Sequence, residues 1–138
     1  MKKYFLLFII VIMFVVGFNY EKIFVVETCV KADGNSCEYV HRQVTKEEAR
    51  VLIEEKDDLV IIDVRTLQEY NEGHILGAKL FPIDSLYIDK DLLMQYKEKP
   101  VLVYCRTKNR AVPAAEELKK WGFIEVYTMI DGYSTWNN

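Results

Sequence analysis

From residue 45 onwards, hydrophobic residues alternate between helix-like and strand-like spacing. Short apolar runs rich in β-branched residues predict strands that are buried on both faces, whereas apolar residues spaced three or four apart predict helices. Strands are predicted at 59–64, 78–81, 101–104 and 125–129, and helices at 45–56, 66–72, 91–96 and 110–121. Strands that alternate with helices favour an α/β domain with a parallel sheet and helices on both of its faces.

The N-terminus follows another pattern. Lys2 and Lys3 precede an almost wholly apolar run at 4–18, as in the n-region and h-region of a signal sequence. As a helix the run would span roughly 22 Å, less than the ~30 Å hydrocarbon core of a bilayer, which favours a secretory signal. No small-x-small cleavage site follows the run, so an uncleaved anchor that keeps 4–18 in contact with the membrane stays open. A buried helix is disfavoured because the run has no polar face.

These observations divide the chain into a signal peptide or anchor at 1–20, a linker at 21–42 and one domain at 43–138. Because lysines beside a signal stay in the cytoplasm, we expect the domain on the extracytoplasmic or periplasmic side. Beyond residue 20 the chain carries 16 basic and 21 acidic residues, a net charge of −5. It has no basic stripe, and we expect no nucleic-acid partner.

The chain has three cysteines of two kinds. Cys29 and Cys37 flank a polar, turn-rich stretch, and in an oxidising compartment we expect them to form a local disulfide, which would contribute about 2.5 kcal/mol. Two free thiols in a linker are the alternative. A zinc site is less favoured because His41 is the only histidine nearby. Pairing of these two leaves Cys105 as the odd thiol and a candidate reactive group.

Cys105 opens a loop between a predicted strand and a predicted helix; we call residues 105–110 the Cys105 loop. It continues with Arg106, Thr107, Lys108, Asn109 and Arg110. A helix N-terminus stabilises anions, and the three cations add to this effect, so we expect Cys105 to react as a thiolate. The loop amides should also hold an anionic substrate. A buried, inert cysteine is the alternative, which three flanking charges disfavour.

Three separated motifs resemble those of rhodanese-like domains. They are IDVRT at 62–66 with EY at 69–70, EGHI at 72–75 and GA at 77–78; VYCRT at 103–107 with NR at 109–110; and GF at 122–123, VY at 126–127 and DG at 131–132 with Trp136. The resemblance covers residues 43–138. It implies an α/β rhodanese-like fold with a central parallel sheet of about five strands and helices on both faces.

The resemblance also implies a chemistry. A cysteine of this family accepts sulfane sulfur as a persulfide and passes it to a thiol or to cyanide, and Cys105 matches that residue. The rest of the Cys105 loop matches the substrate cradle, with Arg110 placed to contact an anion. Asp63 and Arg65 match a supporting pair, and His74 resembles a residue that stabilises a turn. We expect a monomeric domain that needs no cofactor or metal and whose partners are a small sulfur-containing anion and a thiol acceptor.

The sequence departs from the family pattern at four positions. Lys108 and Asp131 replace frequent glycines, Ala111 replaces a frequent serine, and Leu76 replaces a frequent proline. At a position of positive φ, Lys108 would cost about 1 kcal/mol. The departures at Lys108 and Ala111 leave the choice of substrate open.

Three functions are compatible with these residues. The leading hypothesis is an exported sulfurtransferase that acts on thiosulfate, a persulfide or a polysulfide. A non-catalytic binding or regulatory module is the second, and the presence of Cys105 and Arg110 argues against it. The third, a thiol-dependent reductase, needs a resolving thiol, for which Cys29 and Cys37 are the only candidates.

Overall fold

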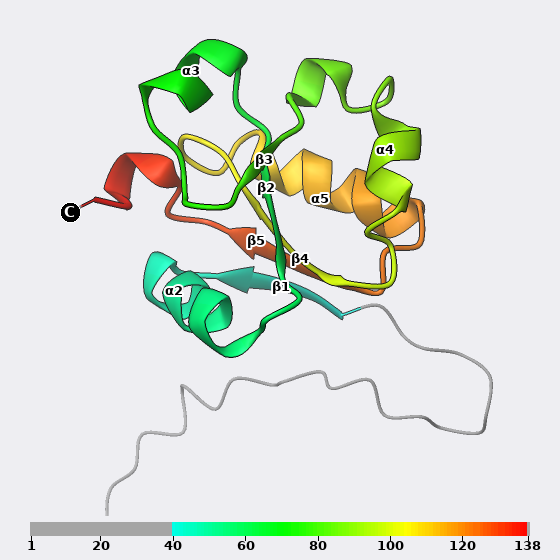
Figure 1. The fold of residues 1–138 in the computed structure, drawn as a ribbon, viewed down its shortest axis with the longest axis horizontal. Helices are drawn as coiled ribbons and strands as arrows, with labels where there is room; N and C mark the ends of the chain where they lie inside the picture. Colours follow the sequence, from blue (N-terminus) through cyan, green and yellow to red (C-terminus); the bar gives the residue numbers. More distant parts are fainter. Residues whose placement is uncertain (1–39, 138) are drawn as a thin grey trace, which may run out of the picture.

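Five parallel strands form the centre of the part of the chain that the computed structural model describes, residues 40–137 (Figure 1). The strands are β1 (Val40–Val44), β2 (Val60–Asp63), β3 (Lys79–Leu80), β4 (Pro100–Tyr104) and β5 (Glu125–Met129), in the order β1-β5-β4-β2-β3. Every neighbouring pair is parallel. The predicted parallel sheet is therefore confirmed, and each of the four predicted strands is present.

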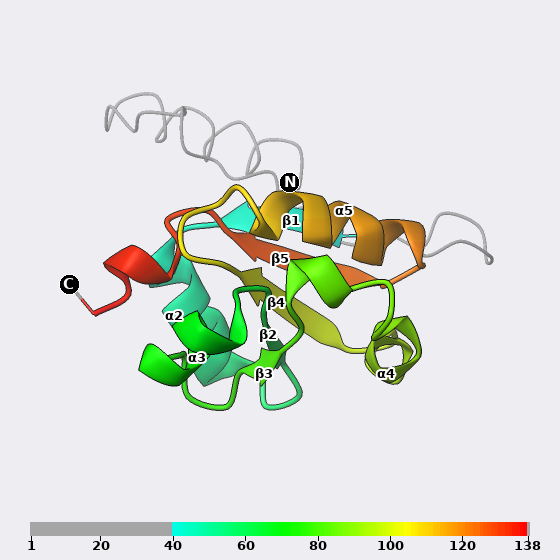
Figure 2. The same cartoon turned by 90° about the horizontal axis from the view of Figure 1, so that it is seen from above.

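Helices cover both faces of the sheet, as predicted. They are α2 (Lys46–Glu55), α3 (Leu67–Glu72), α4 (Lys90–Met94) and α5 (Ala111–Lys120), with short 3₁₀ helices η2 (Ile83–Ser85) and η3 (Tyr133–Thr135). One apolar core lies between the sheet and the residues of α5, η2 and α4, and a second packs against α2 and the segment after α3. Figure 2 shows α5 and α2 on opposite sides of the strands.

The two central strands explain the continuous apolar runs of the sequence. All residues of β2 and β4 are buried, since β4 lies between β5 and β2, and β2 between β4 and β3. A strand with neighbours on both edges and helices on both faces has no position for polar side chains. The exception is Asp63, a buried acid at the carboxyl end of β2.

Strand β1 was not predicted. It begins at Val40, inside the segment assigned to the linker, and pairs only with β5 at the edge of the sheet. The strand was missed because its polar side chains interrupt the apolar pattern. Its residue His41 has specific partners: Nε2 lies 2.9 Å from Oγ1 of Thr128, and Nδ1 lies 3.1 Å from the Glu116 carboxylate. Among the described residues, no group of histidine, cysteine and acidic side chains is arranged to hold a metal.

The helix ends follow their local sequence. Thr45 and Glu48 form the predicted capping box at the start of α2. Helix α5 ends at Lys120, and Gly122, two residues later, has a φ of 85° that places it in the left-handed region. The amide of Gly122 donates to the carbonyl of Lys119, and the amide of Phe123 to that of Leu118, so the last turn of α5 is closed as expected of a glycine stop.

The predicted signal segment at 1–20 and the candidate disulfide between Cys29 and Cys37 lie outside the described residues. Across residues 40–137, no helix combines the length and the apolar character needed to cross a bilayer. Cys105 is a free, buried thiol.

Candidate active site

Cys105 lies directly after β4, at the carboxyl edge of the sheet, and the Cys105 loop leads into the first turn of α5. Its side chain is 1% exposed. The sulfur Sγ accepts a hydrogen bond from the backbone nitrogen of Ala111 at 3.3 Å, so the first amide of α5 points at the sulfur. A helix N-terminus with a free amide stabilises negative charge at this atom. The loop thus places the Cys105 sulfur at a helix N-terminus, and Ala111 contributes through its backbone.

The C-terminal segment fixes the first half of the Cys105 loop. The amide of Tyr133 donates to the carbonyl of Cys105 at 2.8 Å, and the amide of Ser134 donates to the carbonyl of Arg106 at 3.0 Å. Gly132 directly precedes these two residues with a φ of +72°, and a Cβ built there would lie 2.1 Å from the Thr107 carbonyl oxygen. Only glycine allows both this conformation and so close an approach.

Helix α2 holds this closing segment, residues 131–136, in place. The amide of Lys46 donates to the Asp131 carboxylate at 2.8 Å, and its Nζ donates to the Thr135 carbonyl at 3.0 Å. The Arg50 guanidinium lies 4.1 Å from the centre of the Trp136 ring. A carboxylate at a helix N-terminus is stabilising, so Asp131, a departure from the family pattern, has a structural role here.

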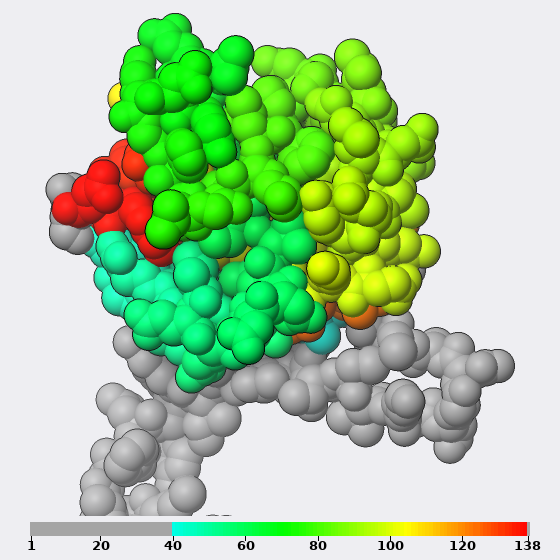
Figure 3. All heavy atoms as spheres, viewed as in Figure 1, coloured from blue at the N-terminus to red at the C-terminus, as the bar shows by residue number. Residues whose placement is uncertain are grey.

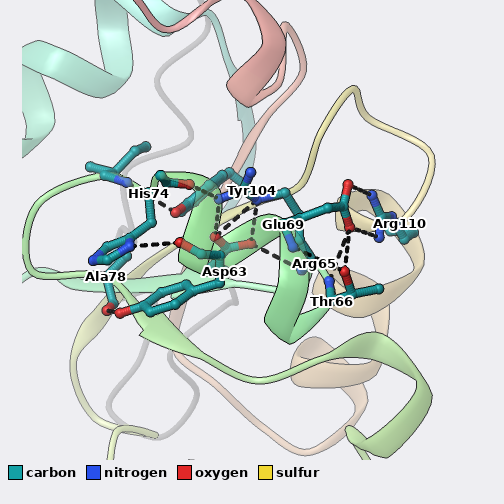
Figure 4. A network of polar contacts seen from close by, with 11 residues as sticks. Asp63, Arg65, Thr66, Glu69, His74, Ala78, Tyr104 and Arg110 are labelled. Carbon is teal, nitrogen blue, oxygen red and sulfur yellow. Dashed lines mark hydrogen bonds and ion pairs between the residues drawn. The ribbon is translucent and has the colours of Figure 1, made fainter.

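Helix α3 fixes the other end of the Cys105 loop (Figure 4). Both terminal nitrogens of Arg110 donate to the Glu69 carboxylate at 2.7 Å, a bidentate, charge-assisted pair. Glu69 is also the N3 residue of a capping box with Thr66. The hydrogen bonds from Arg110 lower the pKa of Glu69 to about 2. The guanidinium that was predicted to face an anionic substrate is therefore bound to a carboxylate in this structure.

Asp63 and Arg65 form a buried ion pair beneath the site, with Nη2 of Arg65 at 2.7 Å from the carboxylate. The same nitrogen donates to the Gly73 carbonyl at 2.7 Å, and the guanidinium lies 4.1 Å from the centre of the Tyr133 ring. Burial and a hydrogen bond with Asp63 raise the pKa of the Tyr104 hydroxyl. These contacts tie the end of β2 to the closing segment, as expected of a supporting pair.

The remaining loop residues divide between two cavities. Arg106 lines a cavity of about 400 Å³ together with residues of α3 and the closing segment. Lys108 and Asn109 line a cavity of about 510 Å³ on the side of β1 and α5. Thr107 is exposed and contributes its carbonyl to the contact with Gly132.

His74 makes its contacts within its own turn. It is exposed, its ring stacks on Tyr70 with centroids 3.8 Å apart, and Nδ1 lies 3.0 Å from the Tyr70 carbonyl oxygen. It has the contacts expected of a residue that stabilises a turn.

Two features of the site did not follow from the sequence. Glu69 was part of a recognised motif but was not assigned to the site; the spacing of Thr66 and Glu69 matches a capping box, which by itself does not indicate an ion pair with Arg110. The contacts of residues 132–134 with the Cys105 loop join segments far apart in the chain, and the sequence indicated this region only through the family motif at Asp131-Gly132.

Cys105 lies beyond the carboxyl end of a strand in a parallel α/β sheet, which is where ligands bind in such folds. Residues 45–138 match the model of the rhodanese-like domain, and the chain belongs to this family. A thiosulfate sulfurtransferase GlpE of Coxiella burnetii is 38% identical over 102 residues, which cover 70% of this chain and 88% of that protein.

Solved structures agree with this assignment. A rhodanese-like domain protein from Staphylococcus aureus is similar with a TM-score of 0.60 at 28% identity, covering 69% of this chain and 90% of that one. A rhodanese-related protein from Thermoplasma volcanium has a TM-score of 0.62 at 24% identity, over 70% of this chain and 90% of that one, and shares the fold.

Gly132→Ala should displace the Cys105 loop, because the new methyl group meets the Thr107 carbonyl. We expect a loss of at least about 2 kcal/mol in the free energy of unfolding, from the clash and the positive φ together, and a changed rate of Cys105 alkylation. Gly77→Ala is the matched control, since Gly77 has a φ of +82° with no atom within 4 Å of its Cβ position. It should cost about 1 kcal/mol and leave alkylation unchanged; equal effects would contradict the account.

Glu69→Gln should weaken the ion pair with Arg110 and reduce stability in a pH-dependent way. Because the folded-state pKa of Glu69 is about 2, below the ordinary 4.5, the pair stabilises the fold fully above pH 4.5 and is lost as pH falls towards 2. Urea titrations should show the variant about 1 kcal/mol less stable near pH 6, with the gap closing near pH 2. The matched control is Glu98→Gln, at an exposed site; a gap that is constant with pH would refute this role of Glu69.

Proposed function

We propose that this chain is an exported sulfurtransferase that carries sulfane sulfur as a persulfide on Cys105. The observation that carries the proposal is the hydrogen bond from the Ala111 amide to Sγ at the N-terminus of α5, with the exposed cations Arg106 and Lys108 on the same loop. This environment favours a thiolate, which is the nucleophilic form of cysteine and needs no separate base.

The reaction proceeds in two transfers. With thiosulfate as donor, the Cys105 thiolate attacks the outer sulfur, the sulfur–sulfur bond of the donor breaks, and sulfite leaves with the electron pair. A persulfide or polysulfide donor reacts in the same way and releases a thiolate or a shorter polysulfide. An acceptor thiolate or cyanide then attacks the outer sulfur of the persulfide, and Cys105 returns as a thiolate held by the Ala111 amide.

The similarity to a protein named thiosulfate sulfurtransferase supports this chemistry. A non-catalytic binding module is the alternative. The ion pair between Arg110 and Glu69 favours it, because this guanidinium is already bound to a carboxylate of the protein. A thiol-dependent reductase would require Cys29 or Cys37 as the resolving thiol. We favour the sulfurtransferase because the loop keeps a free thiol together with the amide that stabilises its anion.

Cyanide-acceptor assays with thiosulfate and polysulfide as donors test the function. We expect turnover by the parent and at least a thousandfold loss in Cys105→Ser, because the oxygen cannot form a persulfide. The double variant Cys29→Ser, Cys37→Ser is the matched control and should keep the parental rate. Binding of the donor without turnover by the parent would favour the binding module, and loss of activity in the control would favour the reductase.

We also propose that the apolar run at 4–18 exports the domain, and that Cys29 and Cys37 pair there as a disulfide. Lys2 and Lys3 before the run support the orientation. Fusion of residues 1–40 to a reporter that is active only outside the cytoplasm should give activity, while Lys2→Glu, Lys3→Glu should reduce it. An inactive parental fusion would rule out export by this segment.

A further inference from the structure

The cavity of about 400 Å³ borders the Cys105 loop at Arg106. Its lining includes Arg106, the residue after Cys105, and Tyr133, whose amide donates to the Cys105 carbonyl. Its opposite wall comes from α3, through Glu69 and Glu72. Figure 3 shows the two contributing segments side by side on the surface, with the closing segment in red and the region of α3 in green.

The charged groups of this cavity are not equally available to a ligand. Arg65 is bound to Asp63, and Glu69 is bound to Arg110. Arg106 is exposed, and its side chain has no ion pair or hydrogen bond within residues 40–137. Glu72 is exposed and accepts one hydrogen bond, from the Gln68 amide at 3.2 Å. The cavity therefore offers a ligand one cation and one carboxylate.

We propose that this cavity binds the sulfur acceptor, and that the acceptor is a zwitterionic amino-acid thiol such as cysteine. The inference rests on the proposed function and names its substrate class. The Arg106 guanidinium would hold the α-carboxylate, because its planar fork matches that group. The Glu72 carboxylate would hold the α-ammonium group, and Ser134 lines the opposite wall beside Arg106.

The charge pattern separates this ligand from simpler anions. A small dianion in the cavity meets Arg106 but also the Glu72 carboxylate, and like charges at short range disfavour it. A zwitterion satisfies the free groups of both signs. The volume of about 400 Å³ accommodates an amino acid, and the other cavity offers Lys108 with no acidic side chain in its lining.

The bound acceptor then takes the outer sulfur in a single displacement. The acceptor thiolate attacks the outer sulfur of the Cys105 persulfide, a new sulfur–sulfur bond forms, and the bond from Sγ to the outer sulfur breaks. The electron pair of that bond returns to Sγ, which the Ala111 amide stabilises. The product is the amino-acid persulfide, and no further oxidant or reductant is needed.

The test uses persulfide-loaded protein and four acceptors: cysteine, cysteamine without the carboxylate, 3-mercaptopropionate without the ammonium group, and 2-mercaptoethanol without either. Because these thiols differ in intrinsic reactivity, each kcat/KM of a variant is divided by that of the parent for the same thiol. The variants are Arg106→Gln and Glu72→Gln, both at exposed positions, with Glu98→Gln as the matched acidic control.

Arg106→Gln should lower the ratio for cysteine and 3-mercaptopropionate about threefold to tenfold more than for the other two thiols. Glu72→Gln should lower it by a similar factor for cysteine and cysteamine only, and Glu98→Gln should change none. Equal losses for all four thiols, or no losses, would overturn this proposal. The proposed function would still stand in that case if cyanide continued to remove sulfur from Cys105. A parent that forms no persulfide would overturn both this proposal and the proposed function.

Discussion

The close approach of Gly132 to the Cys105 loop is the contact on which the rest of the site depends. It allows the amides of Tyr133 and Ser134 to reach the carbonyls of Cys105 and Arg106. These hydrogen bonds hold the first half of the loop. Directly after the loop, the amide of Ala111 donates to Sγ. The geometry of the nucleophile is thus set by backbone contacts, which substitutions of exposed loop side chains leave intact.

The cations of the loop have different roles in this arrangement. Arg110 joins the loop to α3 through Glu69 and holds the loop end that precedes Ala111. Arg106 and Lys108 face separate cavities. The residues that line the two cavities are therefore separate from the ion pair that holds the end of the loop.

Much of the fold could be predicted because the signals for its strands and helix ends lie in neighbouring residues of the sequence. The buried runs of β2 and β4, the capping box at Thr45 and the stop at Gly122 each follow from neighbouring residues. Strand β1 did not follow, because an edge strand with His41 and polar neighbours lacks an apolar run, and its partners lie far along the chain.

The candidate site shows the same limit. Cys105 and the position of its loop followed from the pattern of strand, loop and helix, and from the family motifs. The pairing of Arg110 with Glu69 did not, since an arginine at a loop end is equally suited to an anionic substrate or to a carboxylate of the protein.

Intact-mass analysis after incubation with thiosulfate tests the central claim most directly: the account predicts the gain of one sulfur atom on Cys105, and an unchanged mass with every thiosulfate, persulfide and polysulfide donor would contradict it.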